Sequence, residues 1–390
     1  MIPKSIFIIL AIGLLVSFVS ERINLIKTFY QNTPARITKI NNIGRHEIKF
    51  GDRVRSCEDV LLIEKHHLAI LACDAGRERW NTVMGVFAGN VTENAGLWAY
   101  DYDYDNTNTQ TFRQISLVGF PHPNDFHTLG LAFDLQTSNL FVTNHAQAGS
   151  RIEMFNLDIE SLTARYIQTI EHPLLHAPNS IAIINGHELY VTNDHHVTKR
   201  QSTLISNFET YLGAPTGTVV HLSLKETEVN AKVVARVPFA NGIEILNAST
   251  IAIASSSRAA VYLFDTLNPT TLKYNSKIPL PFLPDNLSGS GDKLMIAGHG
   301  NMPALAKFTQ LRRICNDPFE YERSGSNTKE LCNTVEATSW TAEWSESEGL
   351  KSLYVDTKYP SSSTVVKDAK RRVGIITGLY AKGILVWRYS

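Results

Sequence analysis

The sequence predicts an all-β protein, a six-bladed β-propeller, preceded by a hydrophobic N-terminal segment. At several places a polar pair stands immediately before a short apolar run, and each run is followed by a turn and a second apolar run. Short apolar runs bounded by turn residues are typical of strand hairpins rather than helices. Four-stranded blades with unequal loops accommodate the unequal spacing of these repeats. The polar pairs are Glu58-Asp59, His127-Thr128, Asn179-Ser180, Asn241-Gly242, Asp285-Asn286 and Ser363-Thr364.

The alternative architecture is a two-sheet sandwich built from the same hairpins. A chain of 390 residues with 43% hydrophobic content is long enough for one large propeller or for two smaller domains. Because the repeats are evenly spread, we expect one domain over residues 30–390, with an inserted loop at about 311–345. The formal net charge is zero, so no basic field attracts nucleic acid.

The N-terminal residues differ in composition from the rest of the chain. Residues 5–19, SIFIILAIGLLVSFV, form an uncharged apolar run after Lys4. We interpret residues 1–29 as a secretory signal sequence or a signal anchor, with a buried core helix as the alternative. Whether the segment is cleaved or retained stays open, because the run is shorter than the roughly 20 residues that span a bilayer comfortably. Either outcome places the rest in the secretory lumen or outside the cell, membrane-anchored or secreted.

Cysteine usage fits that compartment. Cys315 and Cys332 bracket a polar stretch, and we expect them to form a disulfide, with two free thiols as the alternative. Cys73 lies inside the apolar run LAILAC and is expected to be a buried free thiol.

Two sequons predict a glycoprotein. Asn90 and Asn247 each begin an Asn-x-Ser/Thr motif and are expected to lie on loops. Asn286 matches the same pattern, but we expect its side chain to serve elsewhere.

The strand starts offer a set of hard oxygen donors. Carboxylate and amide oxygens in one set suit calcium better than zinc or copper. The alternative is that these side chains only cap turns. The candidate ligands are Glu58, Asn179, Asn241, Asp285 and Asn286.

Several segments, in this order, resemble the paraoxonase/arylesterase family from about residue 35 to the end. They are CEDVLLI, DFHTLGLAFD, FVTNH, APNSIAII, LYVTNDHH, FANGIEI, LPDNLSG and AGHGN. The resemblance implies a six-bladed propeller with two calcium ions in its central channel. It also implies calcium-dependent hydrolysis of lactones and aryl esters, with a small-molecule lactone or ester as the substrate.

By this resemblance the five oxygen donors match the ligands of the family's catalytic calcium. His127 and His145 match its histidine dyad, in which one ring acts as base toward water and the other assists. Glu58 is the rival base. The amide of Asn241 is expected to help stabilise the negative oxygen of the tetrahedral intermediate.

Two departures from the family pattern concern the structural calcium and the closure of the propeller. Asp59 and the backbone carbonyl of Leu129 match ligands of the structural ion, but its third ligand, an Asp in the family, falls at Ser180. We therefore expect this ion to bind weakly or to be absent. The family's disulfide joins the terminal strands, whereas the final strand ILVWRYS has no Cys, so closure must depend on strand hydrogen bonds and packing.

Phe239, His195 and His299 lie in matching motifs and are expected to line the cleft, although each is equally compatible with a satisfied core residue. G-x-S-x-G is absent from the sequence, which argues against a serine hydrolase of that class. The alternative function is a calcium-stabilised propeller that acts as a non-catalytic binding module, or as an enzyme of different chemistry.

Overall fold

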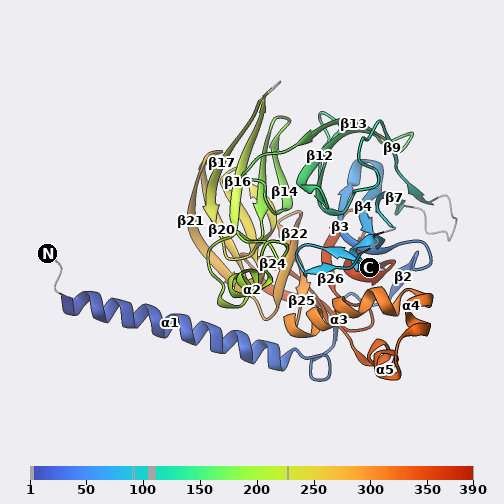
Figure 1. Cartoon of the computed structure of the whole chain (residues 1–390). Helices are drawn as coiled ribbons and strands as arrows, with labels where there is room; N and C mark the ends of the chain where they lie inside the picture. The colour runs from blue at the N-terminus through green and yellow to red at the C-terminus, as the bar shows by residue number, and fades with distance from the viewer. Residues whose placement is uncertain (1–3, 90, 92, 104–110, 226–227, 390) are drawn as a thin grey trace.

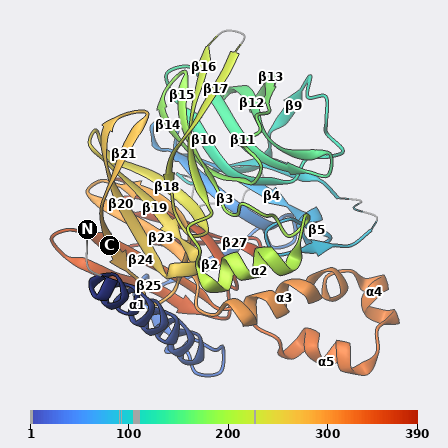
Figure 2. The same ribbon diagram turned by 60° about the vertical axis from the view of Figure 1, so that its left-hand side comes forward.

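Antiparallel β-sheets make up most of the protein, as a computed structural model shows (Figure 1). The structure describes residues 4–89, 91, 93–103, 111–225 and 228–389. The prediction of a mainly β protein is confirmed. The sheets are arranged around a common centre, and helices lie below them in both views (Figure 1 and Figure 2).

Four sheets are each built mainly from four strands that follow one another in the chain. The first contains β10 (Thr128–Asp134), β11 (Asn139–Ala146), β12 (Gly149–Asp158) and β13 (Thr163–Ile170), with β9 (Ser116–Val118) on its edge. The second contains β14 (Pro178–Asn185), β15 (Glu188–Asn193), β16 (Thr218–Lys225) and β17 (Glu228–Arg236). The third contains β18 (Ala240–Asn247), β19 (Thr250–Ser255), β20 (Ala260–Asn268) and β21 (Thr271–Pro279). The fourth contains β22 (Leu283–Ser290), β23 (Lys293–His299), β24 (Ser339–Ser345) and β25 (Gly349–Asp356), with β1 (Ile40–Asn41) on its edge.

A larger sheet combines the two ends of the chain. Its N-terminal strands are β2 (His46–Lys49), β3 (Arg55–Ile63), β4 (Leu68–Asp74), β7 (Ala95–Asp101) and β8 (Phe112–Gln114). Its C-terminal strands are β26 (Ser362–Asp368), β27 (Val373–Lys382) and β28 (Ile384–Arg388). A separate short pair joins β5 (Trp80–Asn81) to β6 (Val86–Phe87).

Hydrogen-bonded strand pairing joins the termini. β2 runs antiparallel to β28, with His46 opposite Trp387 and Lys49 opposite Ile384. The same sheet continues because β27 pairs with β3, where Gly378 lies opposite Cys57. Closure therefore uses strand hydrogen bonds, as the missing C-terminal cysteine led us to expect.

The first strand of each unit lies nearest the common centre. These strands contact one another in a closed ring, in the order β3, β10, β14, β18, β22, β26 and back to β3. The polar pairs identified in the sequence lie in or at the start of these strands. The repeat in the sequence thus corresponds to the inner ring of the fold.

Each inner strand has an irregular register beside its polar pair. The pairing with the second strand shifts between Cys57 and Asp59 in β3 and between Pro284 and Leu287 in β22. Equivalent shifts occur in β10, β14, β18 and β26. A bulge places two residues opposite one, which re-aims side chains that would otherwise alternate between the two faces. Consecutive polar residues can therefore both turn toward the centre.

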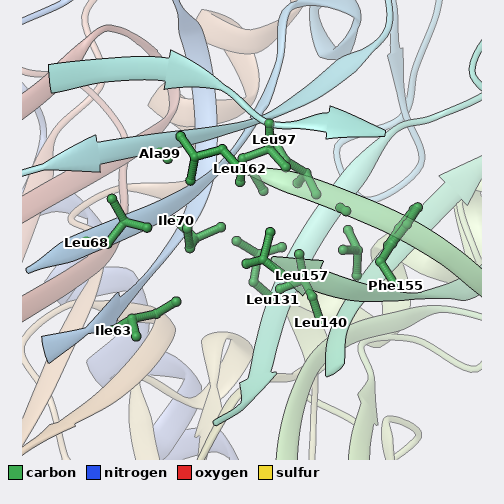
Figure 3. Packing of buried hydrophobic residues seen from close by; sticks show 14 of the residues in the cluster. Ile63, Leu68, Ile70, Leu97, Ala99, Leu131, Leu140, Phe155, Leu157 and Leu162 are labelled. Atoms are coloured by element: carbon green, nitrogen blue, oxygen red, sulfur yellow. The ribbon is translucent and has the colours of Figure 1, made fainter. Parts of the chain in front are cut away.

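Apolar layers fill the space between neighbouring sheets. Figure 3 shows one such layer, where Ile70 and Leu97 of the N-terminal sheet meet Leu131, Leu140 and Phe155 of the next. All five side chains are buried. Such packing of alternating apolar residues is the main source of stability between sheets.

Buried hydroxyl groups link the sheets nearer the centre. Thr143 on β11 donates to the carbonyl of Asn179 on β14 at 3.2 Å. Thr192 on β15 donates to the carbonyl of Asn241 on β18 at 2.7 Å. Ser256 donates to Pro284 of β22 at 2.6 Å. These bonds satisfy carbonyl groups that the bulges remove from regular pairing.

The prediction of an inserted loop at about 311–345 is wrong in its secondary structure. The segment forms three helices, α3 (Met302–Cys315), α4 (Pro318–Arg323) and α5 (Ser326–Thr334), and β24 begins at Ser339. Asn301 caps α3 by accepting from the N–H of Ala304 at 2.7 Å, and Asp317 caps α4. These capping residues were a helix signal that the polar composition obscured.

Both cysteine pairs are oxidised. The predicted Cys315–Cys332 disulfide is confirmed and joins the end of α3 to α5. The prediction that Cys73 is a free thiol is wrong, because Cys73 forms a disulfide with Cys57. The two residues lie opposite each other on β3 and β4, a register that the bulge in β3 determines.

The N-terminal helix α1 (Lys4–Gln31) extends away from the sheets at its N-terminal end (Figure 1). Nearer its C-terminus, Leu25 packs into an apolar cluster with Met302 of α3. Glu21 forms an ion pair with Arg258, and Arg22 donates to the carbonyl of Ser257 at 3.0 Å. Among the described residues, none of the helices combines the length and the apolarity needed to cross a membrane. A further helix, α2 (Thr203–Leu212), lies beside this region (Figure 2).

Gly242 should be essential for close approach within the inner ring. A Cβ at this position would lie 2.5 Å from the backbone N of Leu287 and 2.7 Å from the Cα of Asn286. We expect Gly242→Ala to lower the free energy of unfolding by about 1–3 kcal/mol, because backbone atoms must move. Urea unfolding measures this. Gly89→Ala, where no atom lies within 4 Å, is the control; equal stability of the two variants would contradict the tight ring.

Candidate functional site

A small cavity of about 30 Å³ lies at the centre of the inner ring. Its polar wall consists of Glu58, Arg77, Asn81, Asn179, Asn241, Ser256, Asp285 and His299. Its apolar wall consists of Val83, Met84, Leu129, Phe239, Met302, Leu305 and Leu379. Four of the five predicted calcium ligands therefore border one cavity, and the fifth, Asn286, contacts Glu58 next to it.

Oxygen atoms without hydrogen-bond partners are concentrated at this cavity. Glu58 Oε2, Asn179 Oδ1, Asn241 Oδ1 and Asn286 Oδ1 are all buried and none accepts a hydrogen bond. Buried polar atoms are ordinarily paired, so an unpaired group in a folded protein requires an explanation. Here the unpaired atoms are four of the oxygens that the sequence predicted as metal ligands.

The amide nitrogens hold these oxygens in place. Asn241 Nδ2 donates to Asp285 Oδ1 at 2.6 Å and to Ser256 Oγ at 3.1 Å. Asn286 Nδ2 donates to Glu58 Oε1 and to Thr364 Oγ1, both at 3.0 Å. With both amide hydrogens used, each side chain presents its oxygen alone. Asn241 therefore has no amide hydrogen left for a substrate oxygen, contrary to the role we expected for it.

The electrostatics of the site favour a cation. Burial raises the pKa of Glu58 well above its usual range, and the charges of Asp59 and Asp285 raise it further. A bound cation would reverse this effect by stabilising the ionised carboxylate. In the described part of the chain, no group of three or more His, Cys, Asp or Glu residues could hold a metal. The candidate set is of a different kind, since three of its five members are amides. Two carboxylates and three amide oxygens fit Ca²⁺.

The residues expected at the structural calcium do not fit an ion in the same way. Asp59 Oδ2 accepts from the N–H of Leu131 at 2.7 Å. Its Oδ1 accepts from the N–H of Val60 at 2.8 Å and from Thr364 Oγ1 at 2.9 Å. Both carboxylate oxygens are thus satisfied by protein donors, and Ser180 supplies no second charge. We assign no metal to these residues.

His127 pairs with an acidic residue that the sequence did not indicate. Its Nδ1 lies 3.2 Å from Asp74 Oδ2, and both side chains are buried. Its Nε2 is buried and has no hydrogen-bond partner. A ring that donates from Nδ1 to a carboxylate keeps a lone pair on Nε2. His127 does not border the cavity itself.

His145 is engaged elsewhere. Its Nε2 lies 2.7 Å from the carbonyl oxygen of Pro178, and its Nδ1 contacts Thr82 Oγ1. Burial lowers its pKa, which favours the neutral ring. The rings of His145 and His127 share no hydrogen bond among the described residues, although the backbone N–H of His145 donates to the carbonyl oxygen of His127 at 2.8 Å. The structure thus pairs His127 with Asp74 rather than with His145.

The three residues expected to line the cleft have different surroundings. His299 borders the cavity and its Nε2 lies 3.0 Å from Asp285 Oδ2. Phe239 also borders the cavity and contacts the ring of His195, with centroids 4.5 Å apart. His195 does not border the cavity. Its two ring nitrogens each lie 2.7 Å from a partner, Asp194 Oδ1 and Thr210 Oγ1. His195 is therefore a satisfied core residue, the alternative left open from the sequence.

Asp74 and Arg77 are polar residues of this region that sequence reasoning missed. Asp74 ends β4, and Arg77 follows in a short 3₁₀ helix, η2 (Ala75–Glu78). Gly76 permits this turn, because a Cβ there would lie 2.1 Å from the carbonyl oxygen of Glu93. The available signal was the charged phrase DAGRER directly after a fully buried strand.

A second cavity of about 480 Å³ lies at the opposite end of the inner strands. It is lined mainly by aliphatic residues, including Leu131, Ile181 and Ile243, and contains Glu244. Burial raises the pKa of Glu244 from 4.5 to about 7, although backbone N–H groups of Gly289 and Ile245 lower it. A carboxyl group in this environment favours its neutral form.

The sequence was compared with known protein families and proteins. The Arylesterase family matches residues 84–312, which is more than half of the chain. The chain belongs to the arylesterase family. This match includes His127, Asn179, Asn241 and Asp285, whereas Glu58 lies before it.

Individual relatives match over a smaller part. Serum paraoxonase/arylesterase 1 of Mus musculus is 31% identical over 153 residues, 39% of this chain and 41% of that protein. Serum paraoxonase/lactonase 3 of Homo sapiens is 28% identical over 191 residues, 47% of this chain and 52% of that protein. The chain thus matches about half the length of these curated relatives.

A solved structure supports the fold. A gluconolactonase from Xanthomonas campestris superposes with a TM-score of 0.52 at 12% sequence identity, covering 90% of this chain and 93% of that one. At this identity the similarity concerns the arrangement of the sheets alone.

Glu244 should make stability depend on pH. Its folded-state pKa of about 7 exceeds the ordinary value of 4.5, so the stability present below pH 4.5 is lost as the pH rises through 7. We expect Glu244→Gln, which stays neutral, to raise the melting temperature relative to wild type at pH 8 but not at pH 4.5. Thermal unfolding at both pH values measures this, with the exposed Glu346→Gln as control. An equal effect at both pH values would contradict the assignment.

Proposed function

We propose that the sheets form a six-bladed propeller over residues 30–390, with β2 completing the blade of β26, β27 and β28. The closed ring of six inner strands supports this count. Residues 1–29 are a signal sequence or signal anchor in this proposal. All four cysteines are paired, which supports an oxidising compartment, the secretory lumen or the cell exterior. The exposed turn at Asn247 suits a glycan, and Asn90 lies outside the described residues.

We propose that the protein is a calcium-dependent hydrolase of lactones and aryl esters. The observation that carries the proposal is the set of unpaired oxygens on Glu58, Asn179, Asn241 and Asn286 around one cavity. Asp285 adds the second carboxylate. Membership of the arylesterase family supports the reaction class. The relatives' names include both arylesterase and lactonase, which supports both substrate types.

Calcium in this site would polarise the carbonyl group of the substrate and offset negative charge. The residues themselves supply orientation and proton transfer. Asp74 holds His127 with its proton on Nδ1, which leaves Nε2 free to take a proton from water. The hydrogen bonds of His145 to Pro178 and Thr82 give it a positioning role in this scheme. Glu58 remains the rival base.

The apolar residues limit the access of water to the cavity. Met302 and Leu305 of α3, Phe239, and the loop residues Val83 and Met84 close the cavity. A site shielded in this way strengthens electrostatic interactions between its groups and the substrate.

The second candidate is a calcium-stabilised propeller that binds partners without catalysis. The engagement of both His145 ring nitrogens favours it, because a dyad that passes protons between two rings needs a free nitrogen on each. His127 with its unpaired Nε2 favours the hydrolase.

Hydrolysis of phenyl acetate and of an aliphatic lactone by the full chain tests the proposal. We expect turnover that a chelator abolishes and calcium restores. His127→Gln should lower kcat by roughly 10²–10⁴-fold, the usual contribution of a general base, with calcium affinity unchanged. A folded, calcium-binding but inert wild-type protein would establish the binding module instead. An active His127→Gln variant would indicate that Glu58, rather than His127, is the general base.

Ser180 should restrict the protein to one calcium ion. Because Asp59 is satisfied by Leu131, Val60 and Thr364, we expect calorimetric titration to give one ion per chain. Ser180→Asp should add a second ion and raise the melting temperature in calcium, since it supplies a second carboxylate. Ser180→Asn, which adds no charge, is the control. Two ions bound by wild type would refute this prediction.

A further inference from the structure

Arg77 is a buried cation whose guanidinium contacts no carboxylate among the described residues, although its charge acts on Glu58 and lowers the pKa of that carboxyl. Its side chain is 2% exposed, the guanidinium donates from Nη2 to the carbonyl of Thr128, and its Nε has no partner. No ion pair involving Arg77 occurs in the part of the chain that the structure describes. Arginine stays protonated in proteins, so its charge must be accommodated where it lies.

The neighbouring acidic residues are directed elsewhere. Asp74 directs Oδ2 to His127, and Glu78 pairs with Arg55 at 3.0 Å and accepts from Asn316 at 2.6 Å. Both carboxylates flank Arg77 in the chain, yet each contacts a different donor. An uncompensated buried charge is strongly destabilising. The buried Nε–H of Arg77, which has no partner at the wall of the cavity, therefore points to a ligand that supplies an acceptor oxygen there.

Arg77 borders the cavity that contains the unpaired oxygens. Glu58 and Asp285 are the carboxylates at this wall, and Asp74, whose Oδ1 is buried without a hydrogen-bond partner, adds a third acidic group near Arg77. Asn241 is not available as a donor, because Ser256 and Asp285 take both of its amide hydrogens. Arg77 is thus a guanidinium donor at a site that also presents unpaired oxygens and the unpartnered Nδ1 of His299.

We propose that Arg77 binds the acyl oxygens of the reaction as they become negative. The inference rests on the proposed hydrolase function. Water adds to the acyl carbon as His127 takes one of its protons, and the carbonyl π electrons move to oxygen. The C=O bond then re-forms, the C–O bond to the leaving group breaks, and the leaving oxygen receives the proton from His127. The acid product releases the other proton of the water to solvent and becomes a carboxylate. Arg77 contacts this group both in the tetrahedral intermediate and in the product.

The site is therefore a carboxylate site as well as an ester site. The cavity of about 30 Å³ has room for only a very small group, so the smallest carboxylic acids are the appropriate probes. A carboxylate offers the guanidinium two acceptor oxygens and a negative charge, whereas the matching neutral amide offers one oxygen and no charge. The protein should therefore distinguish acetate from acetamide through Arg77.

Acetate and acetamide are the probes for this proposal. In calcium-loaded full-length protein we expect acetate to bind, by NMR titration, and to inhibit phenyl acetate hydrolysis competitively. Arg77→Met should weaken acetate roughly 10- to 100-fold, as expected for a hydrogen bond to a charged group, and leave acetamide unchanged. Arg77→Lys should recover part of the acetate affinity, and kcat should fall with the same ranking of variants.

Arg151→Met is the matched control. Arg151 is also buried, but its Nε lies 2.7 Å from Glu153 Oε1. Its removal should lower the melting temperature and leave acetate affinity intact, whereas Arg77→Met should keep the wild-type melting temperature or exceed it. Equal acetate affinity of wild type and Arg77→Met would overturn the proposal, as would equal loss for acetamide.

The two proposals fail in different ways. If acetate binding depends on Arg77 but the protein has no hydrolase activity, the carboxylate site stands and the hydrolase proposal fails. Calcium-dependent hydrolysis with no effect of Arg77→Met on acetate or kcat would retain the reaction and remove Arg77 from it. If Arg77→Met does not fold, Arg77→Lys decides the question. A folded Arg77→Lys with wild-type acetate affinity would support the charge requirement, and a folded Arg77→Lys that no longer binds acetate would oppose it.

Discussion

The fold depends on placing polar residues at the centre of stacked apolar sheets. The register shifts in the inner strands make this arrangement possible, because they turn consecutive polar residues toward the same centre and free backbone carbonyls for neighbouring hydroxyls. A regular strand would direct every second polar side chain into the apolar layers between sheets. The same irregularity that solves this packing problem also leaves oxygen atoms unpaired around a cavity.

The sequence predicted the inner ring of strands better than the elements around it. The polar pairs and the apolar runs after them predicted the inner strands, because both are local patterns. The Cys57–Cys73 disulfide was not predictable, since it depends on strand register after a bulge. The pairing of His127 with Asp74 was also hidden, because it joins β4 to β10 across two sheets. The helices α3 to α5 were missed although Asn301 and Asp317 cap them.

The candidate site separates two kinds of charge recognition. Oxygens on one part of the wall suit a cation, and a guanidinium on another part suits an anion. Neither set is satisfied by the protein alone, and both are shielded by apolar side chains from α3 and from the loop around Met84. The four unpaired oxygens thus contrast with the carboxylate of Asp59, whose oxygens accept hydrogen bonds from the protein itself.

The pairing of β2 with β28 has a consequence for biosynthesis. The strand His46–Lys49 leaves the ribosome early, yet its partner Ile384–Arg388 is among the last segments made. At roughly 5–20 residues per second, translation separates the two by on the order of half a minute. Both disulfides close short local loops, so neither holds the waiting edge. A nascent chain therefore exposes an unpaired strand until β28 is synthesised, which makes it a natural client for chaperones.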